Sequence, residues 1–344
     1  MQPLYVTFIF CIVLFLYIHI YAQIKTSNDL EVFEIDNPSK EMLEEICDLK
    51  QPVLFNYTNN IISELFSKKN LIKSYSGFDV NIRNVGKPRT YSTDDLLYVA
   101  LNINDACNLI DTNSDTNANA DTNADTNANA DAIKNVYISE NNSDFLEETG
   151  IVKHIRGSDG FLRPRMLYSS KYDYIIGGKN TTTPFRYGLE YRHFIMATSG
   201  SILIKLSPPK NTKYICEIRD YENMEFGTKY NPWITYKPLH KTADANYNYS
   251  KIKCLDVQID QGKLLYIPPY WWYSIKFGSN TAICDFKYKT FMNAISTLPQ
   301  NCMRILQQHN IKRNILNTVL YKSEENTVDS SNNIVANTDI DATI

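Results

Sequence analysis

The feature that most constrains the fold is a succession of short strand-like runs that begins near residue 165. Each run is rich in β-branched and aromatic residues, and Gly, Pro or Ser separates it from the next. The predicted strands cover residues 165–168, 172–176, 191–197, 201–206, 214–218, 253–259, 263–267, 273–277 and 281–288. Strands repeated every ~8–12 residues predict a mainly β domain, folded as a sandwich or a barrel.

Helices are predicted before and after this β region. Pro38 and Ser39 begin a helix whose apolar face carries Met42, Leu43 and Ile46. The last helix has an apolar stripe, which favours packing on the β domain over a dimer interface. Helices are predicted over 40–49, 61–73 and 298–321, and further strands over 31–35, 53–55 and 79–85.

A polar tract interrupts the N-terminal part. Residues 111–132 consist of DTN, NAN and NAD units, with five Asp and no Lys or Arg. The tract has too little apolar surface to offset the conformational entropy that is lost on folding. We therefore expect it to be a disordered surface insertion. The tract also accounts for the formal net charge of −3, so the rest of the chain is near neutral. A near-neutral body lacks the basic footprint of a nucleic-acid-binding protein.

The N-terminus predicts entry into the secretory route. Residues 4–22 are almost wholly apolar, and about 20 such residues span a bilayer. Ala22 is an acceptable cleavage position, so residues 1–22 are a signal peptide or a signal anchor. The expected location is lumenal or extracellular, either secreted or anchored through residues 4–22. Beyond Cys11 the chain has six cysteines without any CxxC pair, which suit three disulfides or six separate thiols.

Two segments resemble a known family. The first is IGGKNTTTPFRYG at 176–188, continued by GSILIKLSPP at 200–209, and the second is DQGKLLYIPPYWWYSI at 260–275. They are similar to the JmjC and cupin-like hydroxylases, which use Fe(II) and 2-oxoglutarate. The resemblance covers most of residues 31–290. It implies a double-stranded β-helix, a cupin or jelly-roll barrel, with flanking helices and a C-terminal helix.

The family's iron site has three protein ligands, and this sequence departs from all of them. Members carry His-x-Asp on one strand, where residues i and i+2 share a face, and a distal His across the barrel. Those positions hold Arg186, Gly188 and Tyr273. A guanidinium cannot bind a metal, and glycine has no side chain. A match shifted by one residue puts Tyr187 and Leu189 at the first two positions, which are no better.

The co-substrate positions are also altered. In related hydroxylases a lysine holds the 2-oxoglutarate carboxylate, and Ile202 stands at its position. Lys263 replaces the Asp of the Pro-Gly-Asp motif, whereas Thr183, also near the co-substrate in relatives, is retained. The Trp271–Trp272 pair of the second segment is expected to pack inside the barrel.

Few other residues are available for a metal site. Outside the leader and the terminal helix the histidines are His154, His193 and His240, and Glu190 is the carboxylate nearest in sequence. Glu190 and His193 are three residues apart, so within one strand they would face opposite sides. We therefore expect each histidine to be structural or to lie on the surface, and we predict no metal and no cofactor.

These observations favour a non-catalytic, cupin-like pseudo-hydroxylase that acts as a binding or structural module. Its partner would be a protein or a small anionic ligand, since the Arg186 guanidinium can attract an anion. An ion pair within the barrel is the other expectation for Arg186. The alternative is an active Fe(II)- and 2-oxoglutarate-dependent protein hydroxylase with another ligand set. Whichever function applies, residues 291–322 are expected to form a C-terminal helical segment and residues 323–344 a disordered tail.

Overall fold

The computed structural model describes residues 2–57, 59–85, 98–120, 136–221, 223–234 and 249–309. The expected disorder of 121–132, the helix beyond residue 309, the tail at 323–344 and His240 lie outside these ranges. The chain divides into two compact units. One comprises Met1–Ile218 with Phe226–Thr297, and the other comprises Arg219–Glu225 with Leu298–Ile344.

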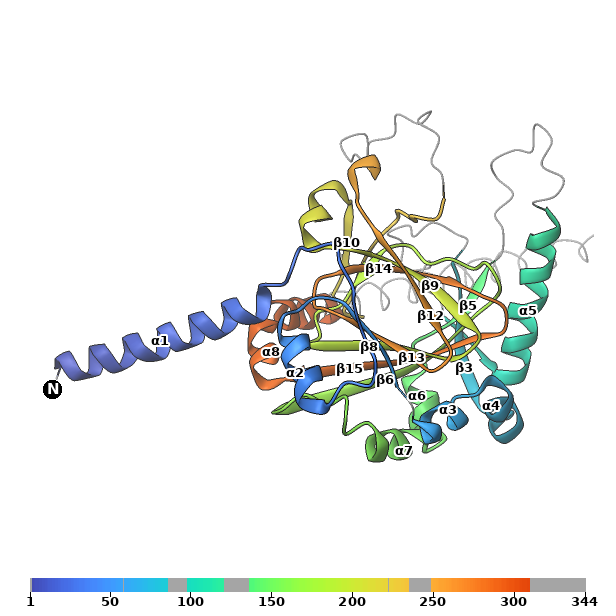
Figure 1. Ribbon diagram of the computed structural model, residues 1–344, viewed down its shortest axis with the longest axis horizontal. Helices are drawn as coiled ribbons and strands as arrows, with labels where there is room; N and C mark the ends of the chain where they lie inside the picture. The colour runs from blue at the N-terminus through green and yellow to red at the C-terminus, as the bar shows by residue number, and fades with distance from the viewer. Residues whose placement is uncertain are drawn as a thin grey trace, which may run out of the picture. The chain divides into compact units, whose positions relative to one another are not determined.

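The described residues form a mixed α+β fold in which strands predominate (Figure 1). The helices are α1 (Gln2–Ile24), α2 (Lys40–Asp48), α3 (Asn60–Leu65), α4 (Lys68–Tyr75), α5 (Ile103–Ala120), α6 (Ser143–Glu148), α7 (Ile151–Ser158) and α8 (Phe291–Ser296). The N-terminal strands are β1 (Phe33–Ile35), β2 (Val53–Asn56), β3 (Asp79–Asn84), β4 (Val99–Asn102) and β5 (Tyr137–Ser139). The later strands are β6 (Leu167–Gly177), β7 (Arg186–Tyr187), β8 (Arg192–Ser199), β9 (Ser201–Ser207), β10 (Glu217–Asp220), β11 (Glu225–Thr228), β12 (Leu255–Asp260), β13 (Lys263–Ile267), β14 (Trp272–Phe277) and β15 (Thr281–Thr290).

The strands form two open sheets. The larger has the order β1-β2-β13-β8-β15-β6-β5-β3-β4, and the smaller has the order β10-β11-β7-β14-β9-β12. Both sheets have edge strands, so the closed barrel implied by the resemblance is not found. The larger sheet stays open because β5, β3 and β4 extend it beyond β6, and β2 and β1 extend it beyond β13.

The strands from β6 onward pair in a nested order. The first, β6, pairs with the last, β15, and β7 pairs with β14. Likewise β8 pairs with β13, and β9 pairs with β12. Strands that are consecutive in this series therefore alternate between the two sheets, except from β9 to β12, where β9, β10, β11 and β12 all belong to the smaller sheet.

The alternation of side chains along β8 shows how the core is divided. Phe194 and Met196 point to one face of the larger sheet and join the core that it forms with helices α2 to α7. Ile195 and Ala197 point to the other face and join a second core, shared with the smaller sheet. Because side chains alternate with a period of two, a slip by one residue would exchange the two cores.

Several details of the helices differ from expectation. Ser39 caps α2 as predicted and accepts a hydrogen bond from the Met42 N–H, but Met42 itself is exposed and Cys47 is buried instead. The helix predicted at 61–73 is interrupted and forms α3 and α4, and the strands predicted at 165–168 and 172–176 are one strand, β6. Described cysteines carry free thiols rather than disulfides.

The first part of the polar tract is helical, which corrects the expected loop at 111–120. Helix α5 is nucleated upstream, where the Asn102 side chain accepts a hydrogen bond from the Asp105 N–H and Cys107 and Ile110 are buried. Once a helix is nucleated, each added residue contributes a further hydrogen bond, so it can extend into a sequence that would not start one. The Lys68–Asp111 ion pair of 2.8 Å fixes α5 at the point where the tract begins.

Helix α1 is exposed along its length and projects away from the two sheets (Figure 1). The segment from Pro3 to Ile24 is long enough and apolar enough to cross a membrane. Lys50, which is 6% exposed, holds the C-terminal end of α1 by donating to the carbonyl oxygens of Ala22 and Gln23. A cation at this end of a helix is favoured by the helix dipole.

The second unit has one described helical segment, residues 298–309. The helix predicted over 298–321 is therefore confirmed for residues 298–309, and the rest of it lies outside the described residues. Within this unit the Tyr221 N–H donates to Gln307 Oε1 at 3.1 Å.

The close approach of β6 to β14 gives a test of the packing between the sheets. A Cβ atom on Gly177 would lie 2.3 Å from Cγ of the buried Phe277 ring, so Gly177→Ala forces that ring to move. We expect a loss of about 1–3 kcal/mol in the free energy of unfolding of the full-length chain in detergent. Gly157→Ala is the matched control because its Cβ would meet nothing within 4 Å, and it should be neutral or stabilising. Equal stability of the two variants would contradict this packing.

Candidate functional site

Two of the three expected ligand positions are neighbours. Arg186 on β7 pairs directly with Tyr273 on β14, and the guanidinium carbon lies 5.2 Å from the centre of the Tyr273 ring. This contact has the geometry of a cation–π interaction. Burial raises the pKa of Tyr273 above its ordinary value, although Arg186 opposes the shift. The phenol therefore stays protonated at neutral pH and is no tyrosinate.

The Arg186 side chain is held by an ion pair inside the domain. Its Nη1 lies 2.6 Å from Oε2 of Glu140, which is 2% exposed and follows β5. The other carboxylate oxygen of Glu140 lies 2.5 Å from Nη2 of Arg83 on β3. The two arginines thus share one buried carboxylate. The ion pair expected for Arg186 within the domain is present.

Gly188 lies beside Glu190 and His193. A Cβ atom at Gly188 would be 2.4 Å from Glu190 Oε2 and 4.0 Å from His193 Nδ1. The Glu190 carboxylate therefore fills the space that a side chain at position 188 would need. The expectation that Glu190 and His193 face opposite sides is wrong, because Glu190 precedes β8 and is free of the strand's alternation.

A buried charged row follows on β15. The Asp285 carboxylate lies 2.6 Å from His193 Nε2 and 2.9 Å from Lys287 Nζ. Burial alone would raise the pKa of Asp285, but the His193 and Lys287 charges and their hydrogen bonds hold it well below the ordinary value. Similarly, burial opposes the charged form of Lys287, but Asp285, Tyr273 and Glu190 raise its pKa well above the ordinary value. Asp285 and Lys287 are therefore both ionised at neutral pH.

The row connects to the Arg186 region through aromatic contact. The His193 and Tyr273 rings lie 5.2 Å apart in an edge-to-face arrangement. Burial would raise the pKa of Glu190, but Lys287, Lys289 and His193 lower it overall. We call the set Arg83, Glu140, Arg186, Glu190, His193, Tyr273, Asp285 and Lys287 the inner charged cluster.

The remaining predicted positions do not join this cluster. The Thr183 hydroxyl accepts a hydrogen bond from the Ile275 N–H at 2.9 Å, so it serves the backbone of β14. Ile202 is 2% exposed and packs in the apolar core between the sheets. In the shifted match, Tyr187 donates to Glu217 and Leu189 is buried. Trp271 and Trp272 are both fully buried, but only Trp271 packs in the core between the sheets, whereas Trp272 joins a separate cluster with Phe185 and Ile215.

Several members of the cluster were not found from the sequence. Arg83, Glu140, Asp285 and Lys287 lie far from the two segments of the resemblance. The available signal was in β15, where Ile283, Asp285 and Lys287 occupy alternate positions and so share one face. Charged residues on the same face as a buried isoleucine predict a paired charge in the interior.

The residues at the three ligand positions do not fit an iron triad. Arg186 carries a fixed positive charge, Tyr273 a protonated phenol, and a carboxylate at position 188 would collide with Glu190. Within the described ranges, no group of three His, Cys, Asp or Glu side chains is arranged to hold a metal ion.

Comparison with known proteins adds no relative: no family model matches the chain, and no curated protein matches it. The site is therefore interpreted from its own geometry.

Asp173 on β6 provides a pH test of this interior. Its carboxylate accepts hydrogen bonds from the Asn142 N–H at 2.7 Å and the Asn141 N–H at 2.8 Å, yet burial raises its pKa to about 6. The folded state binds the Asp173 proton more tightly than the unfolded state does. Protonated Asp173 therefore stabilises the fold below about pH 4, and this stabilisation is lost as the pH rises through 6. The resulting change in the free energy of unfolding is on the order of 3 kcal/mol.

We therefore expect Asp173→Asn to cost most at pH 4 and progressively less towards pH 7, because the variant lacks the titrating proton. Urea unfolding of the full-length chain at several pH values in this range measures the difference. Asp79→Asn, at an exposed position of β3, is the matched control and should follow the wild-type pH profile. A constant difference between Asp173→Asn and wild type across this range would contradict the buried, proton-binding carboxyl.

Proposed function

We propose that the chain is a double-stranded β-helix domain of the cupin and JmjC type that has lost its iron site and acts as a binding or structural module in the secretory pathway. The nested pairing of β6 with β15, β7 with β14, β8 with β13 and β9 with β12 supports the fold assignment. Such nesting is what results when one long hairpin folds over into two facing sheets, as in a jelly roll.

The observation that carries this proposal is the contact between Arg186 and Tyr273. The resemblance places both residues at iron-ligand positions on strands that are far apart in sequence, and β7 and β14 pair at these two residues. An incorrect match would have no reason to bring positions 186 and 273 together. The Glu140 carboxylate pairs with Arg186 as well as with Arg83, so the chain itself supplies a counter-charge to the Arg186 guanidinium.

The alternative is an active Fe(II)- and 2-oxoglutarate-dependent protein hydroxylase with other ligands. One observation favours it: Glu190 Oε2 has no hydrogen-bond partner and lies, like His193 Nδ1, beside the Cβ position of Gly188. Against it, the Nε2 atom of His193 already bonds to Asp285, and Lys287 and Arg186 place positive charge around the same region.

The module's partner is proposed to be a protein or a small anionic ligand, and the location a lumenal or extracellular one. A retained α1 would anchor the domain, and cleavage after Ala22 would release it. The bonds from Lys50 to the Ala22 and Gln23 carbonyls favour retention, because they tie this helix end to the folded domain.

Metal content and turnover of the purified full-length chain test the loss of the iron site. We expect no iron above the background of a Tyr273→Phe variant, and no consumption of 2-oxoglutarate when Fe(II) and ascorbate are added. Iron close to one equivalent per chain together with 2-oxoglutarate turnover would overturn the proposal in favour of the hydroxylase.

Reconstruction of the site tests the alignment of the resemblance. Arg186→His, Gly188→Asp and Tyr273→His together restore the ligand types but leave the collision with Glu190. Adding Glu190→Ala removes that collision, so we expect the fourfold variant to bind about one Co(II) per chain and the threefold variant to bind far less. Equilibrium dialysis and the Co(II) absorption spectrum measure binding, and circular dichroism checks folding. A folded fourfold variant that binds no better than wild type would show that the alignment is wrong.

A further inference from the structure

The short helix α8 turns its polar side chains inward and its apolar side chains outward. Its polar residues Asn293 and Ser296 are buried, and the Asn293 side chain donates to the Leu189 carbonyl oxygen at 2.9 Å. The apolar residues Phe291 and Ile295 are 51% and 43% exposed. They are four positions apart, so they share one face of the helix. A surface helix in water buries its apolar stripe, so this arrangement favours an apolar medium outside α8.

The exposed apolar surface continues from α8 onto the start of β6. The rings of Phe291 and Tyr168 lie 5.2 Å apart in an edge-to-face arrangement, and both side chains are exposed. Met166, directly before β6, is 74% exposed and lines one cavity of about 230 Å³ together with Phe291. We call Met166, Tyr168, Phe291 and Ile295 the apolar patch. Large apolar side chains that gather on a surface mark a site of contact with a partner or a membrane.

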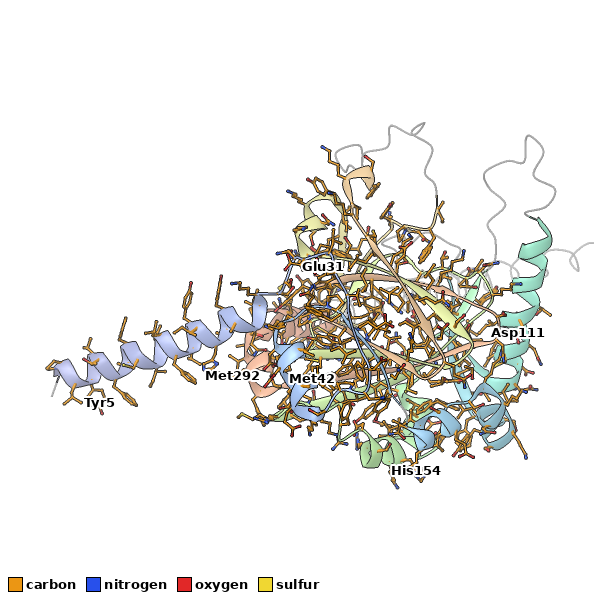
Figure 2. The ribbon with its side chains drawn as sticks, viewed as in Figure 1. Tyr5, Glu31, Met42, Asp111, His154 and Met292 are labelled. Atoms are coloured by element: carbon orange, nitrogen blue, oxygen red, sulfur yellow. The ribbon has the colours of Figure 1, made fainter. Side chains whose placement is uncertain are left out.

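The apolar patch lies at the base of α1. Gln23, in the last turn of α1, lines the same cavity as Met166 and Phe291, and α8 contacts α1. Figure 2 labels Met292 of α8 close to this end of α1, and Figure 1 shows α4 and α5 on the opposite side of the sheets. Among the described residues of α1, those that are partly buried share one face of its last turns: Leu16, His19, Ile20 and Gln23.

The length of α1 indicates the depth of the apolar patch relative to a membrane. The candidate span Pro3–Ile24 has 22 residues. At ~1.5 Å per residue it is about 33 Å long, close to the ~30 Å of the hydrocarbon core. The last turn of α1 therefore lies where the hydrocarbon meets the headgroups, and α8 lies beside it. This step rests on the proposed retention of α1 in the membrane.

We propose that the apolar patch inserts into the membrane interface beside α1, so that the domain rests on the bilayer in one orientation. The occupant of the patch is the lipid bilayer itself. Aromatic side chains such as Phe291 and Tyr168 are favoured at the level of the headgroups. The contact leaves α4 and α5 facing away from the membrane (Figure 1).

The charges around the patch indicate which lipids suffice for this contact. Arg165, which precedes Met166, is exposed but pairs with Glu44 of α2 at 2.8 Å. Asp48 of α2 lines the same cavity and is also exposed. With acidic and basic groups balanced beside the patch, the contact depends on apolar insertion and not on anionic lipid. A bilayer of phosphatidylcholine is therefore a sufficient probe.

Tryptophan fluorescence of the full-length chain in phosphatidylcholine nanodiscs tests the contact. Bromine on the acyl chains, close to the headgroups, quenches a tryptophan that enters the bilayer. An inserted interfacial side chain reaches ~5–10 Å into the headgroup and acyl boundary, so we expect bromine to reduce the fluorescence added by Phe291→Trp roughly twofold. Phe78→Trp, exposed between α4 and β3, is the matched control and should not be quenched. The three native tryptophans are common to all variants, and the wild type gives their contribution.

A third reporter separates the contact from the anchoring by α1. Phe10→Trp lies at an exposed position within the candidate span. Quenching of Phe10→Trp without quenching of Phe291→Trp would overturn the contact and leave the anchor in place. If neither is quenched, α1 is not in the bilayer, and the retained anchor and the contact both fail. Emission from Phe291→Trp that is shifted to the blue but unquenched would assign the patch to a protein partner, such as a second copy of the chain, and overturn the proposal.

A charge placed in the apolar patch gives a second, independent variant. Met166→Glu changes an exposed side chain, so it should leave the fold intact while opposing insertion. In the Phe291→Trp background we expect Met166→Glu to abolish most of the quenching by bromine. Val99→Glu, at an exposed apolar position of β4, is its control and should leave the quenching unchanged. Equal quenching with Met166→Glu and with Val99→Glu would show that the patch does not insert.

Discussion

The interior of this domain depends on the neutralisation of buried charge at one end of the space between its two sheets. Glu140 lies between Arg83 and Arg186, and Asp285 lies between His193 and Lys287, so each carboxylate has two partners. Removing a member of such a set leaves an uncompensated buried charge, which costs several kcal/mol. The strands that meet here, β3, β7, β8, β14 and β15, are therefore held in register by electrostatics as well as by the apolar core beside them.

This arrangement also supplies the charge and the side chains that fill the region around Gly188 from the chain itself. The Arg186 guanidinium provides fixed positive charge from the chain itself, stacked on the Tyr273 ring. Glu190 occupies the space left by Gly188, so the region is filled by the protein's own side chains.

Local sequence signals predicted most of the strands, because β-branched runs bounded by Gly and Pro depend little on distant contacts. The helix at 40–49 was also predictable, since Ser39 is a strong cap. The extension of α5 into the polar tract was not, because it depends on burial of Cys107 and Ile110 against the sheet. Similarly, the resemblance identified Arg186 and Tyr273, but Glu140 and Lys287 reach them only through the pairing of strands distant in sequence.

The most direct test of the central claim is a double-mutant cycle between Arg186 and Glu140. Arg186→Met, Glu140→Gln and the double variant would be compared with wild type in free energy of unfolding at pH 7. If Glu140 pairs with Arg186 in the folded domain, the two substitutions couple by about 1–3 kcal/mol, because Arg186→Met removes one of the two arginines on Glu140 and Glu140→Gln removes the carboxylate that both arginines share. Additive effects, with a coupling energy near zero, would show that the two side chains do not pair and would contradict the account.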